Sequence, residues 1–364
     1  MSAPDRPLLA AALIVRDEAD NLPACVASLA GLVDEIHVHD TGSADGTPEL
    51  AARLGARVTR APWTDDFAAA RNAAQQGWTA SWVLSVDADH RCTGDPARLR
   101  ALLAGAGAGA GYDVLRVDID NAHDELPYTH TEARLYRPQA VRWLGRVHER
   151  LVTPGGDRPP VADLSRDLLV LEHRGYADPA ARVAKAVRNA DLARLALDEL
   201  AAAGLDADRA ELARTLLDLG RSQVGAGRKQ EAVDTFEMLR ELFPGTPEWL
   251  QATDFLARLV LAAGMDDVCL VLVDQLRMAG APRPYCDWLA AQALAQLGDV
   301  AAAAGLLAGL TEVVDTAGRR PDPRALAELR DLVTRLAATA IRPGTARPAP
   351  ARPARNRPRR GRVR

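Results

Sequence analysis

The most informative reactive residues of this chain are two aspartates that follow a short apolar run. Residues 82–86 read WVLSV, and Asp87 and Asp89 come directly after them. Two carboxylates two residues apart in an extended segment point to the same side, and Mg²⁺ and Mn²⁺ prefer carboxylate oxygens as ligands. The pair alone is a weak indication of a metal site, because aspartate is also common in loops and at helix N-caps.

Short apolar runs that alternate with helical stretches must position these carboxylates. The predicted strands cover residues 8–15, 35–39, 56–60, 82–86 and 112–118. The predicted helices cover residues 19–29, 47–54, 67–76 and 96–103. This alternation is typical of an α/β domain built on a largely parallel sheet. Three of the first four strands end in polar loops that contain acids, and such ends meet at one crevice of the sheet. We therefore expect the acids to converge on one site.

Composition and missing motifs exclude several classes of protein. The chain has 364 residues, 48% of them hydrophobic and 26% charged, which fits about two globular domains. Its four cysteines are far apart and form no CxxC pair, which argues against a disulfide framework or a zinc ribbon. It lacks the glycine-rich loops of P-loop kinases and nicotinamide-dependent dehydrogenases. It also lacks an apolar window of about 18 residues, so we expect a cytoplasmic protein without a membrane span.

The charge is divided unevenly along the chain. The formal net charge is −4, but residues 342–364 carry nine arginines and no acid, so the remainder carries −13. The tail is rich in Pro, Ala and Gly, a composition that predicts disorder. Nine arginines could bind nucleic-acid phosphates, but no aromatic residues are interleaved with them to stack on bases. The composition therefore argues against nucleic acid as a partner.

A second domain of a different kind is predicted at residues 176–341. Ala, Leu and Arg recur there at helical spacing, and Gly227, Gly264 and Gly298 each close a predicted helix. Small or apolar residues follow these glycines five and nine positions later: Ala232, Phe236, Cys269, Val273, Ala303 and Leu307. Intervals of 37 and 34 residues between the glycines are typical of helix-turn-helix solenoids. The first unit resembles a tetratricopeptide repeat and the next two are degenerate; an ordinary helical bundle is the alternative.

Four motifs in order make the first domain similar to family-2 glycosyltransferases. They are ALIVRDEADNL at residues 12–22, VDEI leading to DTGSADGT within residues 33–47, ARN at 70–72 and VDAD at 86–89. The similarity covers about residues 8–175, and the closest subgroup is bacterial, with tetratricopeptide-like repeats after the transferase domain. The resemblance implies a GT-A, Rossmann-like nucleotide-binding domain at residues 1–175, then the helical repeat domain at 176–341 and the tail at 342–364.

The same resemblance implies an inverting transfer from a UDP- or GDP-linked sugar with Mn²⁺ or Mg²⁺. The implied donor-binding residues are Asp17, Glu18, Asp40, Arg71 and Asp87, and the implied cation ligand is Asp89. Asp40 would accept a hydrogen bond from the base, and Asp87 would hold the ribose or a metal-bound water. A cation and Arg71 would supply positive charge as the diphosphate leaves.

Each of these roles has a plainer alternative. Asp40 could simply organise the turn that follows it, and Arg71 could be a solvated helix cation. Two positions depart from the family pattern, since Asp17 stands where Asn is usual and His90 follows Asp89 where an acid is common.

A later segment offers a base for the acceptor's proton. Residues 134–137 (RLYR) and 143–149 (WLGRVHE) resemble the family's late segment, which ends in G-x-[IV]-H-E. Direct displacement at the anomeric carbon needs a group that accepts this proton, and we assign that role to Glu149. His148 alternates with Glu149 in a strand-like pattern, so we expect it to face the other way, toward the metal or the diphosphate.

Other residues compete for these roles. Glu149 could instead form a structural salt bridge with Arg146 or Arg150. Three acids before this segment, Asp118, Asp120 and Asp124, are alternative bases. His173 also matches a feature at the end of such domains, where a packing role is as reasonable as a ligand role.

The sequence thus predicts a metal-dependent, inverting glycosyltransferase whose repeats hold a peptide, protein or glycan acceptor. One alternative is an interaction scaffold with a degenerate transferase domain, for which Asp17 and His90 are the only signs. Another is a nucleotidyltransferase, which shares the crevice and the acidic metal site. That class usually has a basic, glycine-rich loop after its first strand, where this chain has residues 16–20, RDEAD.

Overall fold

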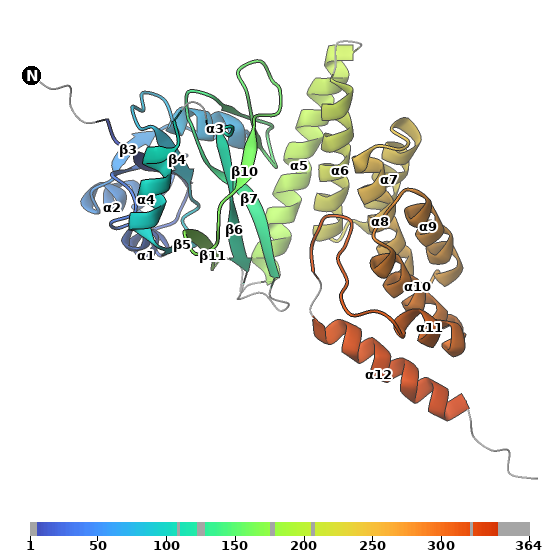
Figure 1. The fold of residues 1–364 in the computed structure, drawn as a ribbon. Coiled ribbons are helices and arrows are strands. Elements are labelled where there is room, and N and C mark those ends of the chain that lie inside the picture. The colour runs from blue at the N-terminus through green and yellow to red at the C-terminus, as the bar shows by residue number, and fades with distance from the viewer. Residues whose placement is uncertain are drawn as a thin grey trace, which may run out of the picture.

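The computed structural model describes residues 6–107, 110–121, 128–174, 179–204, 208–320 and 323–340. A sheet domain that ends at His173 lies beside a helical domain that begins at Pro179 (Figure 1). The predicted disordered tail, residues 342–364, lies outside the described residues. Within the described ranges, no helix combines the length and the apolar character that crossing a bilayer requires.

The first half of the sheet domain follows the predicted alternation. Its elements are β1 (Leu9–Val15), α1 (Leu22–Ser28), β2 (Glu35–Asp40), α2 (Thr47–Arg53), β3 (Arg57–Arg60), α3 (Phe67–Ala74), β4 (Trp82–Ser85), β5 (His90–Gly94) and α4 (Pro96–Gly105). Strands β3, β2, β1 and β4 lie side by side in that order and are parallel. The predicted strands and helices of this domain are all present, with ends that differ by no more than three residues.

The second half of the sheet is mixed, so the prediction of a largely parallel sheet is wrong there. Its strands are β6 (Val114–Asn121), β7 (Tyr128–Tyr136), β10 (Val161–Asp163), β11 (Leu169–His173) and the edge strand β5, while β8 (Arg142–Leu144) and β9 (Arg150–Val152) form a separate two-stranded sheet. Strand β7 lies between β4 and β6 and is antiparallel to both. Only six residues separate β6 from β7, too few for the crossover that a parallel pair needs.

The described part of the second domain contains helices and no strand, with an irregular segment at residues 308–320. The helices are α5 (Pro179–Ala203), α6 (Arg209–Gly225), α7 (Lys229–Leu242), α8 (Pro247–Ala262), α9 (Asp266–Met278), α10 (Arg283–Leu297), α11 (Val300–Leu307) and α12 (Pro323–Ala340). Gly227, Gly264 and Gly298 follow helices with φ of 76°, 73° and 85°, a left-handed conformation that favours glycine. The six residues predicted to follow them in register are all buried. The predicted helix-ending glycines and the predicted buried positions after them are therefore confirmed.

The two domains contact each other through α5 and α6, which stand next to the sheet domain (Figure 1). Arg146 pairs with Glu199 of α5, and Arg150 pairs with Glu211 of α6 at 2.6 Å. The guanidinium of Arg188 on α5 lies 5.1 Å from the centre of the ring of Phe67. Both domains therefore border the space in front of the sheet edge.

Candidate active site

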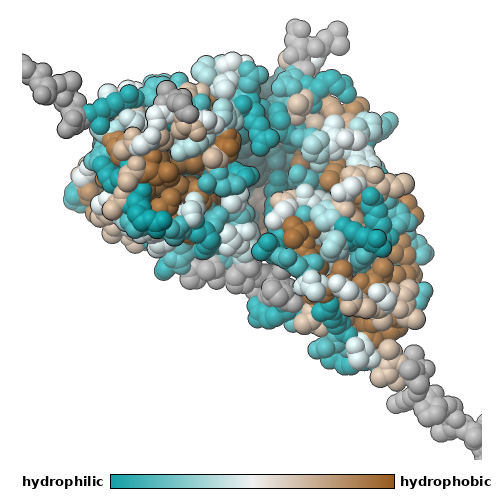
Figure 2. All heavy atoms as spheres, in the orientation of Figure 1, coloured by the Kyte–Doolittle hydropathy of each residue, from teal (hydrophilic) through white to brown (hydrophobic). Residues whose placement is uncertain are grey.

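A cavity of about 1020 Å³ lies where the carboxyl ends of β1 and β4 face the helical domain. In Figure 2 the surface is hollowed where the two domains meet, and hydrophilic residues border the hollow. Six of the eight predicted site residues line the cavity: Glu18, Arg71, Asp87, Asp89, His148 and Glu149. Asp17 and Asp40 are not among its lining residues. Most of the predicted residues thus converge on one space.

Arg71 is the centre of a buried charge network. It lies on α3, whose N-terminus is capped by the side chain of Asp66. Its Nε donates to Oε1 of Glu149 at 2.6 Å, and its two terminal nitrogens donate to Oγ of Ser85 at 2.7 Å and to Oδ1 of Asp87 at 3.1 Å. Only 7% of the residue is exposed. The alternative of a solvated helix cation is therefore wrong.

Arg134 on β7 is a second buried cation of the site, and sequence reasoning gave it no role. One terminal nitrogen donates to Oδ2 of Asp87 at 3.1 Å, and its Nε donates to Glu132 at 2.7 Å. Burial by itself raises the pKa of Asp87, but Arg134 and Arg71 outweigh it and hold that pKa well below its usual range. Asp87 therefore stays charged, with each carboxylate oxygen committed to an arginine.

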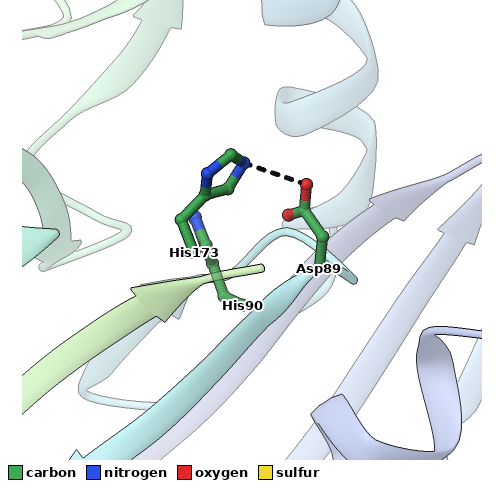
Figure 3. Close-up of side chains that lie close together, drawn as sticks. All are labelled: Asp89, His90 and His173. Carbon is green, nitrogen blue, oxygen red and sulfur yellow. Dashed lines mark ion pairs between the residues drawn. The ribbon is translucent and has the colours of Figure 1, made fainter. Parts of the chain in front are cut away.

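Only one of the two carboxylate oxygens of Asp89 has a partner among the described residues. Its Oδ2 lies 3.1 Å from Nε2 of His173, and the two side chains point toward each other in Figure 3. Its Oδ1 is buried and has no hydrogen-bond partner among the described residues, which is uncommon for a buried polar atom. Burial raises the pKa of Asp89, but the hydrogen bond and the charge of His173, together with a smaller contribution from His90, outweigh this and lower it. Asp89 is thus a charged group with an unsatisfied oxygen.

Asp89, His90 and His173 offer ligand atoms that lie within 4.8 Å of one another. His90 Nδ1 accepts the backbone N–H of Asp87 at 3.2 Å, and burial lowers the pKa of His90 to about 4, so its ring is neutral. As a metal ligand His90 would first have to give up that hydrogen bond or lose its other ring proton. The set fits a divalent cation, with Asp89 and His173 as the more available ligands. For His173, a ligand role is thus at least as well supported as packing.

The segment that carries His148 and Glu149 is a bent loop between β8 and β9, so the strand-like prediction for it is wrong. Gly145 and His148 both have positive φ, 107° and 51°, which breaks the alternation of an extended chain. His148 is exposed and lies near Asp218 of α6, where its charge opposes the raising of the Asp218 pKa by burial. Among the described residues, His148 is not part of the candidate metal group.

Glu149 faces the sheet edge and not its neighbours in sequence. Its predicted alternative partners, Arg146 and Arg150, pair with Glu199 and Glu211 of the helical domain. Arg71 holds its Oε1, and no described residue donates a hydrogen bond to its Oε2. Since Glu149 lines the cavity, this second oxygen is available to a ligand there.

Asp40 is buried at the end of β2, with 3% of the residue exposed. Its Oδ1 accepts from the backbone amides of Gly42 and Ser43 at 3.1 and 3.2 Å. The alternative role of organising the turn is therefore confirmed for this oxygen. Its Oδ2 is buried and accepts no hydrogen bond within the described ranges, so a ligand's N–H could still be accepted there.

The first loop ties the ends of β1 and β2 together. Asp17 has φ of 56°, donates its backbone N–H to Oγ of Ser43 and accepts from the amide of Ala44 with Oδ1. Asn and Asp both tolerate this left-handed conformation, so aspartate in place of the usual asparagine keeps the geometry. Glu18 lines the cavity, and burial raises its pKa.

Two of the other predicted bases, Asp118 and Asp120, are not at the cavity. Asp118 and Asp120 pair with Arg166 at 3.1 and 2.7 Å and are not among the lining residues. Asp124 lies outside the described residues. Of the described candidates for the base, Glu149 lines the cavity.

The parallel strands, the mixed second half of the sheet and the acid-lined crevice define a GT-A-like α/β domain followed by helical repeats. Residues 11–152 match the family model of Glycosyl transferase family 2, and residues 214–246 match that of the tetratricopeptide repeat. The chain thus contains a family-2 glycosyltransferase domain and at least one tetratricopeptide repeat, as the sequence motifs predict.

Similar proteins cover part of the chain. A TPR repeat-containing protein of Synechococcus elongatus is 40% identical over 139 residues, which are 38% of this chain and 34% of that protein. An uncharacterized glycosyltransferase of Rickettsia felis is 32% identical over 81 residues, 22% of this chain and 28% of that protein. The chain thus spans about a third of the length of these relatives. A crystal structure of S. aureus TarS 1-349 is 14% identical, with a TM-score of 0.39, and the match covers 79% of this chain and 88% of that one.

Proposed function

We propose that this protein is a metal-dependent glycosyltransferase that moves a sugar from a UDP- or GDP-linked donor to an acceptor hydroxyl, with inversion at the anomeric carbon. The observation that carries the proposal is the arrangement of charge at one sheet edge. Two buried guanidinium groups, an unsatisfied Asp89 oxygen and an open Glu149 oxygen border the same cavity. The family-2 domain at residues 11–152 supports the same chemistry.

The donor would bind along the carboxyl edge of the parallel strands. Asp40 Oδ2, buried and unpaired, would accept an N–H of the base. Arg71 and Arg134 place positive charge where a diphosphate would lie. Asp17 would fix the first loop, while Glu18 and Asp87 would contact the ribose or the cation's water shell.

Asp89 and His173 would hold a divalent cation, because the buried Oδ1 of Asp89 has no hydrogen-bond partner in the described part of the chain. An imidazole nitrogen in the ligand set favours Mn²⁺ over Mg²⁺, which is the harder ion. When bound, the cation supplies positive charge that stabilises the departing diphosphate. His148 would act at the rim of the cavity and not as a ligand, since it lies outside the candidate metal group of the described chain.

Glu149 would act as the general base. The acceptor oxygen attacks the anomeric carbon and forms the new C–O bond, while the bond to the diphosphate oxygen breaks and the nucleoside diphosphate leaves with the electron pair. The hydroxyl proton passes to Oε2 of Glu149. The bond between Arg71 and Oε1 would fix the carboxylate in position for this transfer.

The acceptor, a peptide, a protein or a glycan, would enter from the helical side. Helices α5 and α6 contribute lining residues to the cavity opposite the strand ends. In this proposal residues 1–175 form the transferase domain, residues 176–341 form the repeat domain that selects the acceptor, and residues 342–364 form the tail.

A donor screen tests the proposal. Full-length protein is incubated with UDP- and GDP-linked sugars and Mn²⁺ or Mg²⁺, and the released nucleotide is measured by mass spectrometry. Asp89→Ala should reduce the release by about 100-fold or more. Asp167→Ala is the matched control, because Asp167 is an exposed acid that pairs with Arg98.

Two results would contradict the proposal. Full activity in Asp89→Ala would refute the assignment of Asp89 as a ligand of the cation. Absence of metal-dependent binding of any UDP or GDP compound in calorimetry would favour the scaffold alternative.

A further inference from the structure

The wall that the helical domain contributes to the cavity is strongly basic. Its charged lining residues are five cations and one acid: Lys185, Arg188, Arg214, Arg221, Arg319 and Asp208. The acid is already in use, because Oδ1 of Asp208 caps α6 by accepting from the amides of Ala210 and Glu211. The lining groups of this wall therefore carry a net positive charge.

Carboxylates behind the wall neutralise it only in part. Arg214 contacts Oε2 of Glu211 at 3.0 Å, but the same oxygen lies 2.6 Å from Arg150 of the sheet domain. One carboxylate thus serves two guanidinium groups. Asp218 lies 3.7 Å from Arg221, and burial raises the pKa of Asp218, which makes it a weaker counterion.

Arg221 lies close to other positively charged side chains. Burial lowers its pKa, and although Asp218 opposes this, the charges of Arg319 and Arg258 add to the lowering. Guanidinium groups close enough to disfavour one another's charge are stabilised by an anion between them.

The remaining two arginines have little to neutralise them. Arg319 and Arg188 are exposed, and neither has an ion-pair partner among the described residues. Arg188 donates a hydrogen bond of 3.4 Å to Asn189 and lies over the ring of Phe67. Both guanidinium groups therefore have free donors toward the cavity.

We propose that this wall is a subsite for an anionic group, a phosphate or a carboxylate, of the acceptor, with Arg188, Arg221 and Arg319 as its cations. The inference rests on the proposed function, because it is that function which gives the cavity an acceptor. Guanidinium groups bind both kinds of anion with paired hydrogen bonds. The donor's diphosphate has its own cations, Arg71 and Arg134, on the sheet side of the cavity.

Anion binding to the full-length protein tests the subsite. Inorganic phosphate and succinate are titrated separately by calorimetry at low ionic strength, so that the two arms distinguish phosphate from carboxylate. Arg188→Gln/Arg319→Gln should weaken binding of the preferred anion by about tenfold or more. Arg194→Gln/Arg320→Gln is the matched control, since these exposed arginines lie on α5 and beside Arg319 but do not line the cavity.

Binding should persist when UDP or GDP with Mn²⁺ is present at saturation. Displacement of the anion by either nucleotide would assign the arginines to the donor and overturn the inference. Unchanged binding in the double variant, or an equal loss in the control, would overturn it as well. Because all four positions are exposed, circular dichroism should show unchanged folding in every variant.

The donor screen separates this inference from the proposed function. Donor cleavage without arginine-dependent anion binding would refute the subsite alone. Arginine-dependent anion binding without any donor cleavage would refute the transferase and leave an anion site with another purpose.

Discussion

Replacing Arg71 by methionine gives the sharpest test of the charge network. Arg71 lies 2.6 Å from Glu149 and 3.1 Å from Asp87. In Arg71→Met, Asp87 keeps its contact with Arg134, but Glu149, whose side chain is 13% exposed, loses its cation. An unpaired buried charge costs about 3–5 kcal/mol. At about 1.4 kcal/mol per factor of ten, hydrogen-exchange protection of the sheet domain should fall by about two to four orders of magnitude.

A double variant and a surface variant make this test specific. Arg71→Met/Glu149→Gln removes both charges and should recover most of the loss, because neutral groups in place of a buried pair are often close to neutral in stability. Arg98→Met breaks an ion pair with the same N–O distance of 2.6 Å, to Asp167. The side chains of Arg98 and Asp167 are both more than half exposed. Solvent therefore screens this ion pair, and the loss of protection in Arg98→Met should be much smaller than in Arg71→Met.

Exchange of the backbone amides of β1 and β4 in the full chain measures these effects within the sheet domain itself. If Arg71→Met and the double variant had equal protection, the coupling between Arg71 and Glu149 would be refuted. If Arg98→Met lost as much protection as Arg71→Met, the argument from burial would fail.

Three other changes can be tested in the same chain. Glu149→Gln should slow nucleotide release by about 10²–10⁴ in single-turnover kinetics with donor affinity unchanged; a parallel loss of affinity would mean a structural role. Gly220→Ala would make the added Cβ clash with the buried Phe236 ring, so urea unfolding should show a loss of about 1–3 kcal/mol that Phe236→Leu recovers. Burial raises the pKa of Asp34, but hydrogen bonds from backbone amides and Arg100 outweigh it and lower the pKa below its usual range. Its stabilisation is therefore present above the usual pKa of an aspartate and is lost as the pH falls through the lowered pKa, so Asp34→Asn should flatten the loss of stability measured in acid.

The parallel half of the sheet could be predicted because its central strands are buried on both faces. Nearly every residue of β1 and every residue of β4 is buried, and such strands give continuous apolar runs in the sequence. The loops after β2 and β4 were predictable for a related reason, since each begins where an apolar run gives way to an acid. The acids Asp40, Asp87 and Asp89 could therefore be placed at one edge.

The mixed half of the sheet and the small β8–β9 sheet were harder to predict. Strand β7 is mostly polar, with only its last two residues buried, so it has no apolar run to reveal it. Strands β8, β9 and β10 have three residues each, too few for a pattern of period two to be recognised. Arg134, which lies on β7, was consequently known only as part of a motif and not as a partner of Asp87.

The pairing of Glu149 could not be predicted because distant groups decide it. Its sequence neighbours Arg146 and Arg150 have side chains that are 23% and 30% exposed. Each forms an ion pair with a glutamate of the helical domain. The side chain of Arg71 is only 8% exposed, and a buried cation requires counterions far more than an exposed one does. The burial of Arg71 therefore favours its ion pair with Glu149 over the pairing of Glu149 with Arg146 or Arg150. The helical domain takes part in this outcome, since Glu199 and Glu211 occupy the two nearer arginines. On this reasoning the repeat domain helps to set the orientation of the proposed base as well as the charge of the cavity wall opposite it.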